Sequence, residues 1–299
     1  MAESEPSNIL IIDKKHRRSR YANNEPGVQL LIDQIGGIHN VHLARLWSAR
    51  KFLLVEGKDL SLLKRWHAEL YPDAELTLDA IPSLPIGGWS GWPYAVESSM
   101  ALKNAVGDRI ITYCILDSDY HSAAEIELRY KDAAARGVSL HVWSGKEIEN
   151  FLLQPRPVRR VLARAKDHTI PSESEILKKI LELCEQERRS VEDGIASSLM
   201  QADRKLDVST VNKIARSRVN QIWRTETRRP MVVSGKDLLA GLSTWAKEEC
   251  GLAFGPPAVA RQMTITDIPE EVASIIRAVE EGDAFPTFEE RQARWKVAA

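Results

Sequence analysis

The sequence predicts an α/β protein, a parallel sheet flanked by helices with a helical insertion. Between residues 51 and 155, short apolar runs that suit strands alternate with segments in which apolar residues recur at helical spacing. After Pro157 the alternation stops, and helical patterns continue to about residue 227 without a convincing strand. Residues 231–239 again suit a strand, a turn and the start of a helix. Strands that alternate with helices pair in parallel through right-handed crossovers, and helices then cover both faces of the sheet.

Residues 51–155 contain predicted strands and helices in alternation, with glycines where several of these elements end. Gly87 and Gly88 close a short apolar segment, and Gly107 and Gly137 are placed as the C-terminal stops of helices. The expected strands are KFLLVE (51–56), RIITYCILD (109–117) and VSLHVW (138–143), beside the short apolar segment 80–88. The expected helices are 59–70, 90–107, 122–137 and one that starts within KEIENFLL (146–153).

The predicted insertion, residues 156–230, is basic. It holds 17 lysines and arginines against 11 acidic residues, a net charge of +6, whereas the whole chain has a net charge of -1. Residues 231–299 are expected to complete the α/β layer and to end in a closing tail that contains one amphipathic helix, 270–281.

The first fifty residues form a separate piece. Residues 7–13 suit a strand, the basic run KKHRRSR (14–20) a loop or arm, and residues 26–37 a short helix. These elements are too few to make a domain alone, so the predicted organisation is an N-terminal segment (1–50), an α/β core (51–155), the insertion (156–230) and a completing segment (231–299).

Composition excludes several classes of protein. With 299 residues, 43% hydrophobic and 28% charged, the chain suits a folded protein of one or two domains. Cys114, Cys184 and Cys250 lie far apart, which favours neither a zinc site nor a disulfide framework. The polar start MAESEPSN is unlike a signal peptide, and no apolar run approaches the length of a membrane span. We therefore expect a cytoplasmic protein that does not enter a membrane.

Acidic residues follow three of the predicted elements where the chain leaves the sheet. Glu56 ends the first strand, Asp117 and Asp119 follow the strongest strand, and Glu147 and Glu149 lie in the segment after the next strand. Neighbouring parallel strands are about 4.8 Å apart, so acids at their carboxyl ends share one pocket. Clustered carboxylates repel one another unless a hard cation binds them, which indicates Mg²⁺ or Mn²⁺, and a pair of such ions suits phosphodiester hydrolysis.

Taken singly, each acid has a plainer interpretation as a helix cap or a solvated loop residue. Three acidic clusters in register on an α/β alternation favour the metal site for the set. Glu147 and Glu149 would point about 200° apart in one α-helix. One of the two is therefore expected to be structural, and the sequence leaves open which.

The segments FLLVEGKD, CILDSDYH and KEIENFLL, in this order and spacing, resemble the TOPRIM fold of the overcoming-lysogenization-defect (OLD) family of ATPase-nucleases. The resemblance covers about residues 50–155, and VSGKDLL resembles a later family segment that follows a helical insertion. It implies a TOPRIM-type sheet and an endonuclease that cleaves or nicks DNA with two cations, often in antiphage defence.

The resemblance also implies roles for individual residues. Its catalytic residues would be Glu56, Asp117, Asp119 and Lys236, with the lysine near the scissile phosphate. Its metal ligands would be Glu56, Asp59, Asp117, Asp119 and Glu147 or Glu149. Asp59 departs from the family pattern, because the expected aspartate would stand one residue later, where this chain has Leu60.

Relatives carry an ABC-type ATPase ahead of the TOPRIM region, and this chain has no GxxxxGK[ST] phosphate loop. Residues 1–50 resemble the trailing segment of such an ATPase. We therefore expect no ATP site in this chain and an ATPase partner or domain. Whether that ATPase is lost by truncation or supplied by another chain stays open, and ATPase-linked relatives suggest a homo-oligomer.

A run of arginines surrounds a tryptophan late in the insertion, and this cluster suits a nucleic-acid backbone contact. Its members are Arg216, Arg218, Trp223, Arg224, Arg228 and Arg229. The alternative is a solvated helix face with the tryptophan in the core.

The sequence therefore predicts a Mg²⁺- or Mn²⁺-dependent endonuclease acting on DNA. Two alternatives remain, a toxin-like ribonuclease of the same fold and a non-catalytic TOPRIM module that binds nucleic acid or a partner.

Overall fold

The computed structural model describes residues 10–13, 18–21, 49–57, 59–106, 110–165 and 168–295. They divide into two compact units that are discontinuous in sequence. The first unit holds the described residues up to Ile115 together with residues 133–141 and 276–285, and the second unit holds the rest. The helix predicted over residues 26–37 lies outside the described residues.

A small antiparallel pair, β1 (Leu10–Asp13) and β2 (Arg18–Tyr21), begins the first unit. The strand predicted over residues 7–13 is confirmed for its described part. The end of the basic run KKHRRSR was predicted as a loop or arm. It lies instead in β2, where Arg18 stands opposite Asp13 in the backbone register of the two strands.

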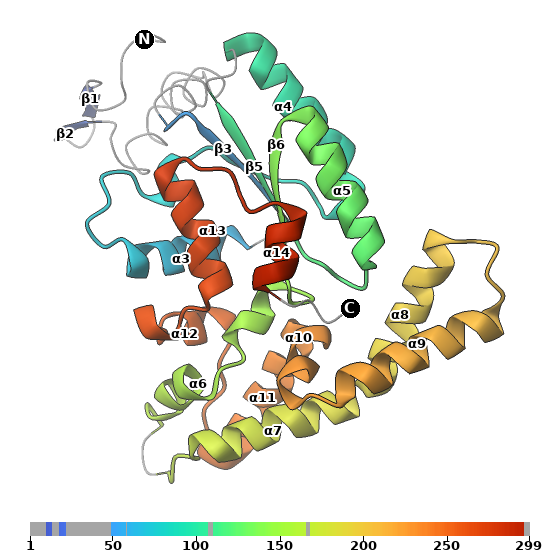
Figure 1. The fold of residues 1–299 in the computed structure, drawn as a ribbon. Coiled ribbons are helices and arrows are strands. Elements are labelled where there is room, and N and C mark those ends of the chain that lie inside the picture. Colours follow the sequence, from blue (N-terminus) through green and yellow to red (C-terminus); the bar gives the residue numbers. More distant parts are fainter. Residues whose placement is uncertain are drawn as a thin grey trace. The chain divides into compact units, whose positions relative to one another are not determined.

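The main sheet has four parallel strands in the order β4-β3-β5-β6, flanked by helices (Figure 1). The strands are β3 (Lys51–Val55), β4 (Ser83–Pro85), β5 (Ile111–Leu116) and β6 (Val138–Val142). β3 and β5 are almost wholly buried, which is typical of parallel strands covered on both faces. The predicted α/β class with a parallel sheet is confirmed.

Two helices lie on opposite sides of this sheet, α3 (Leu60–Leu70) and α4 (Trp92–Val106) (Figure 1). The 3₁₀ turns η2 (Leu78–Ala80) and η3 (Trp89–Gly91) connect them to β4. The C-terminal part of α13 (Glu270–Glu281) closes the unit, as predicted for the tail. Its Glu280 carbonyl accepts a hydrogen bond from Lys51 Nζ at 2.7 Å, and the Glu280 carboxylate lies 2.8 Å from His67 Nε2.

The second unit is mainly helical. Its elements include α6 (Pro155–Leu162), α7 (Glu173–Gln186), α8 (Arg188–Ala202), α9 (Val208–Trp223), α11 (Gly235–Cys250), α12 (Pro256–Ala260) and α14 (Phe288–Arg294). Short turns are η4 (Ile148–Leu152), η5 (Glu226–Arg228) and η6 (Ile265–Asp267), and α5 (Ala123–Arg136) follows β5. The insertion is helical as predicted. The strand predicted at residues 231–233 is wrong, because Arg229–Val232 forms the short helix α10.

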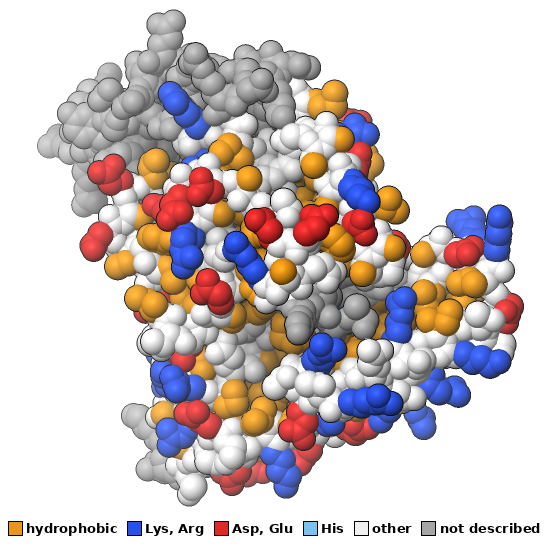
Figure 2. Space-filling model, viewed as in Figure 1, with side chains coloured by type: hydrophobic (Ala, Val, Ile, Leu, Met, Phe, Trp, Pro, Cys, Tyr) orange, Lys and Arg blue, Asp and Glu red, His pale blue; other side chains and the backbone are white. Residues whose placement is uncertain are grey.

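Helices α8 and α9 run side by side as an antiparallel pair (Figure 1). Their facing residues are buried and apolar, with Val191 and Ile195 on α8 and Val211 and Val219 on α9. Figure 2 shows several basic side chains along this pair, with hydrophobic and acidic side chains among them. None of the helices in the described part of the chain is both long and apolar enough to cross a membrane.

Candidate active site

The two aspartates that follow β5 have different environments. Asp117 is 4% exposed, and its Oδ1 accepts a hydrogen bond from the Ile148 backbone N–H at 3.2 Å. Asp119 lies at φ +44°, a left-handed conformation that asparagine and aspartate tolerate better than most residues. Its backbone N–H donates to the Lys146 carbonyl at 3.1 Å, while its side chain is 45% exposed. The loops after β5 and β6 are therefore joined with one carboxylate inside and one at the surface.

Glu147 and Glu149 both point toward Lys236. Glu147 has extended backbone (φ -138°, ψ 159°) at the N-cap of η4, and Glu149 lies in the first turn of this 3₁₀ helix. The Lys236 Nζ atom lies 3.2 Å from Glu147 Oε2 and 3.6 Å from Glu149 Oε2. The premise that the two side chains point about 200° apart does not hold, because this segment is a 3₁₀ helix and not an α-helix. Which of the two glutamates is structural stays a prediction.

The start of α11 brings Lys236 to the glutamates. Ser234 caps the helix, and Gly235 packs directly against the backbone of η4. A Cβ atom at Gly235 would lie 2.6 Å from the Asn150 backbone nitrogen and 2.9 Å from the Glu149 carbonyl carbon. Contacts this short require a glycine, so Gly235 sets the distance between Lys236 and the two carboxylates.

Asn150 ties the same elements together through its buried side chain. Its Oδ1 accepts a hydrogen bond from Glu147 N at 2.6 Å, and its Nδ2 donates to the carbonyls of Pro230 and Val233 at 2.6 and 2.8 Å. Sequence reasoning did not select Asn150, although it stands beside the acids in KEIEN. A buried amide with all these partners is a rigid support for the site.

The charged groups of the cluster affect one another's ionisation. Burial alone would raise the pKa of Glu147, but the ammonium groups of Lys146 and Lys236 lower it below its ordinary value of 4.5. Burial raises the pKa of Glu149, and Lys236 offsets this only in part. Burial would lower the pKa of Lys236, yet Glu149, Glu147 and Asp117 together raise it well above 10.5. Lys236 is therefore a firmly protonated ammonium among carboxylates.

These opposite shifts predict opposite effects of two isosteric changes. We expect Glu149→Gln to raise the urea midpoint of unfolding at pH 7, because it removes a buried charge that is poorly compensated. Glu147→Gln should lower the midpoint, because it removes a carboxylate that both lysines stabilise.

The pH dependence separates the two effects. A raised folded-state pKa makes Glu149 cost stability as the pH rises above about 4.5, so the advantage of Glu149→Gln should grow over that range. A lowered pKa makes Glu147 contribute above about 4.5, so the deficit of Glu147→Gln should shrink as the pH falls below that value. Equal midpoints for both variants from pH 4 to pH 8 would contradict the assigned charges.

Lys146 supports the other side of Glu147. Its Nζ donates to Glu147 Oε1 at 2.7 Å, lies 4.0 Å from Asp119 Oδ1 and sits 5.3 Å from the centre of the Tyr120 ring. Burial raises the pKa of Tyr120, and the neighbouring carboxylates raise it further, so the phenol stays neutral. Lys146 is thus a second cation beside the acids that sequence reasoning did not select.

Glu56 and Asp59 belong to the first unit. Glu56 follows β3, and Gly88, at φ +80°, lies against its carboxylate: a Cβ atom at Gly88 would be 2.5 Å from Glu56 Oε1. Gly88, at the end of the predicted apolar segment 80–88, therefore allows backbone to approach Glu56. Asp59 is buried as the N-cap residue of α3, where its carbonyl accepts the first backbone hydrogen bonds of the helix.

The donor chemistry of the second unit suits a hard cation. Asp117, Asp119 and Glu149 offer only carboxylate oxygens, the ligands that Mg²⁺ and Mn²⁺ prefer. Glu149 Oε2 is buried, and its distance to Lys236 is beyond that of a normal hydrogen bond. Within the described residues, however, no three His, Cys, Asp or Glu side chains converge into a metal-binding group.

The residues of the arginine cluster lie in different environments in the structure. Trp223 is 6% exposed, and its indole N–H donates to Glu185 at 2.8 Å, so the ring lies in the core as in the alternative interpretation. Arg229 donates twice to the Trp223 carbonyl, at 3.1 and 2.8 Å, and so binds the C-terminal end of α9.

The other four arginines are accessible to different degrees. Arg216 and Arg224 are exposed, whereas Arg218 and Arg228 are half-buried. Arg216 pairs with Glu192 at 3.3 Å, a surface ion pair of little energetic value. These four side chains remain available for contact with a polyanion.

Comparisons of the chain with protein-family models, with curated proteins and with solved structures find no match. The function is therefore inferred from the residues of the site and their geometry.

Proposed function

We propose that this chain is a Mg²⁺- or Mn²⁺-dependent endonuclease of the TOPRIM type that cleaves or nicks DNA. The observation that carries the proposal is the cluster of charges after β5 and β6, in which three buried carboxylates lie beside exposed charged groups. In it, Asp117, Asp119, Glu147 and Glu149 lie on loops joined by backbone hydrogen bonds, and Lys236 lies between the two glutamates. Such a set of acids and one lysine is suited to phosphoryl chemistry, and a stability requirement alone would not produce a buried, poorly compensated carboxylate.

The proposed metal ligands are Asp117, Asp119 and Glu149. Glu56, which follows β3 in the first unit, is a further proposed ligand on the resemblance alone. A bound divalent cation would activate water and offset the charge on the phosphate. Asp59, which caps α3, and Glu147, which two lysines compensate, are less suited to this role.

The lysines have separate proposed tasks. Lys236 is more than half exposed and stays protonated, so its ammonium is placed to bind a phosphate oxygen and to stabilise the charge that develops there. Lys146 is mostly buried, and it holds Glu147 and the loop of Asp119 in position.

The basic insertion is proposed to bind the nucleic-acid backbone through Arg216, Arg218, Arg224 and Arg228. Neutralisation of phosphates by lysine and arginine supplies salt-dependent affinity without regard to sequence. The resemblance alone supports three further proposals, namely a role in antiphage defence, an ABC-type ATPase partner and assembly as a homo-oligomer. A cytoplasmic location is proposed from the sequence composition.

One observation favours a second candidate, a non-catalytic TOPRIM module that binds nucleic acid. Both lysines already compensate Glu147, and no three ligands converge within the described residues. Such a module would keep its affinity for DNA whether or not Asp117 is intact.

The test is cleavage of supercoiled plasmid by the purified chain with Mg²⁺, Mn²⁺ or EDTA. We expect nicking with metal, none with EDTA, and loss of nicking in Asp117→Asn, which keeps the size of the side chain but removes its charge. Asp193→Asn, an exposed change on α8, is the control and should nick like the wild type.

If the wild type does not nick but binds the plasmid as tightly as Asp117→Asn does, the non-catalytic module is correct. A structured RNA under the same conditions tests the ribonuclease alternative. Cleavage of the RNA without cleavage of the plasmid would replace DNA as the substrate.

A further inference from the structure

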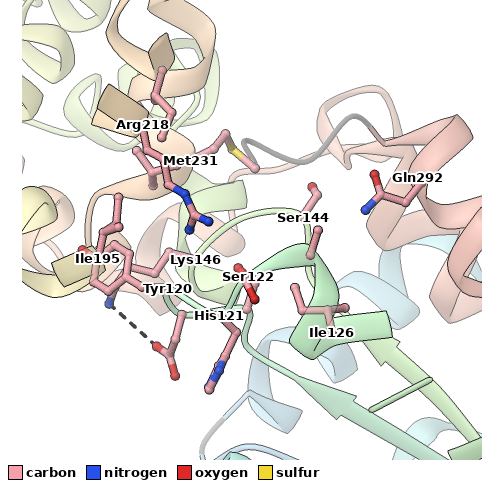
Figure 3. A pocket seen from close by; sticks show the side chains of 15 residues that line it. Tyr120, His121, Ser122, Ile126, Ser144, Lys146, Ile195, Arg218, Met231 and Gln292 are labelled. Carbon is pink, nitrogen blue, oxygen red and sulfur yellow. Dashed lines mark ion pairs between the residues drawn. The ribbon is translucent and has the colours of Figure 1, made fainter. Parts of the chain in front are cut away.

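A cavity of about 120 Å³ lies within the second unit beside the loops of the charge cluster (Figure 3). Its lining comes from the loop after β5, the start of α5, the loop after β6, and helices α8, α9, α10 and α14. Asp119 and Lys146 belong to this lining, so the cavity opens beside the proposed catalytic loops. A single water molecule needs about 10–15 Å³ by this measure, so the space suits a group as large as one planar ring.

The wall of the cavity is mixed, with one apolar side among polar residues. Ile126, Ile195 and Ile222 are almost fully buried core residues that also face this space, together with Met231 and Val232. This apolar side suits the face of a flat, weakly polar group, whereas a bare phosphate ion would lose its hydration against it.

Most polar groups around the cavity already have partners. The Ser118 hydroxyl donates to the Gly145 carbonyl at 2.8 Å, the Ser122 hydroxyl donates to Glu125 at 2.8 Å, and Lys146 is paired with Glu147. These groups shape the cavity, but their hydrogen bonds are directed elsewhere.

Arg218 and Gln292 differ from these groups. Both are half-buried and line the cavity, and neither side chain makes a hydrogen bond or ion pair with any residue that the structure describes. Figure 3 shows the guanidinium of Arg218 pointing from α9 toward the loop that carries Ser122. A guanidinium can stack on an aromatic ring and donate to its edge, and a glutamine amide both donates and accepts.

We infer that this cavity takes one unstacked nucleobase of a single-stranded DNA segment. The isoleucines would contact the faces of the base, and Arg218 and Gln292 would bind its edge or its phosphate. The inference rests on the proposed function, and it specifies the substrate as single-stranded or locally unpaired DNA. A base inside a duplex is stacked and paired, so it could enter only after extrusion, at a cost of a few kcal/mol.

The experiment measures binding by fluorescence anisotropy in EDTA, where metal-dependent cleavage cannot occur. The probes are a labelled 12-nucleotide single strand and the same strand in a duplex. The wild type should bind the single strand about tenfold more tightly, the gain expected when one base stacks in a protein site.

Two variants locate this preference. Ala123→Trp places a large side chain into the cavity from a half-buried position, and Arg218→Ala removes the guanidinium but keeps the space. Both should reduce affinity for the single strand to near that for the duplex. The control is Lys213→Ala, an exposed change elsewhere on α9, which should keep the preference for the single strand.

Equal affinity of the wild type for single strand and duplex would overturn the inference. So would a preference that survives in both Ala123→Trp and Arg218→Ala, with circular dichroism showing that each is folded. Because these assays contain no metal, a protein that prefers single strands but never cleaves would retain the base site and lose the proposed nuclease. A protein that cleaves plasmid but shows no preference for the single strand would retain the proposed nuclease and lose the base site.

Discussion

Lys236→Met is expected to reduce single-turnover cleavage of plasmid DNA at least about 100-fold, the usual loss when a group that stabilises developing charge is removed. The ammonium lies 3.2 Å from Glu147 and 3.6 Å from Glu149, and it is the only cation near Glu149 that these contacts show. Its loss should also raise the pKa of Glu149 further and leave that carboxylate more often protonated. The chain would then lose a phosphate contact and a charged metal ligand together.

The matched control is Lys247→Met, an exposed change on the same helix, α11. It should cleave within about twofold of the wild type, because surface substitutions away from a site have little effect. Cleavage by Lys236→Met at the wild-type rate would remove Lys236 from the mechanism, whatever the outcome for the acids.

Asn150→Leu is expected to have the largest effect on stability. The change keeps the approximate volume but leaves the Glu147 backbone N–H and the carbonyls of Pro230 and Val233 without their buried partner. Each such group costs about 1–3 kcal/mol, so the free energy of unfolding should fall by roughly 3 kcal/mol or more. The urea midpoint measures this loss, and cleavage should fall with it because Lys236 is no longer held at a fixed distance.

Asn212→Leu on α9 is the control for this change, since Asn212 is exposed and the substitution should leave the midpoint almost unchanged. A midpoint of Asn150→Leu close to that of Asn212→Leu would show that the amide does not tie these elements together.

Much of the fold could be predicted because the spacing of the apolar residues and the positions of glycine and proline indicate the same helices and strands. Residues 51–56 and 109–117 are apolar enough to be buried strands, and the tail helix Glu270–Glu281 has the bounds that its amphipathic pattern predicts. The prediction of a strand at residues 231–233 failed because Met231, Val232 and Val233 favour a strand only by their local propensity. The structure instead places them where Asn150 and Lys146 bind their backbone carbonyls, and such tertiary contacts are invisible in a short apolar run.

The acids of the site were predictable, whereas their arrangement was not. The strand-end rule selects Asp117, Asp119, Glu147 and Glu149. It does not show that η4 is a 3₁₀ helix that turns both glutamates toward Lys236, nor that Lys146 already compensates one of them. For Trp223 the sequence predicted an accessible side chain, because its place beside five arginines suggested a stacking surface. In the structure its hydrogen bond to Glu185 keeps the ring in the core.

The most direct test of the central claim is Mn²⁺ binding by the chain, followed by electron paramagnetic resonance without nucleic acid. If the acids after β5 and β6 hold the cation, the wild type should bind Mn²⁺ and Asp117→Asn should bind it at least about tenfold more weakly. Asp193→Asn should bind Mn²⁺ like the wild type. Identical binding curves for the wild type and Asp117→Asn would contradict the claim that this cluster is a metal-dependent catalytic centre.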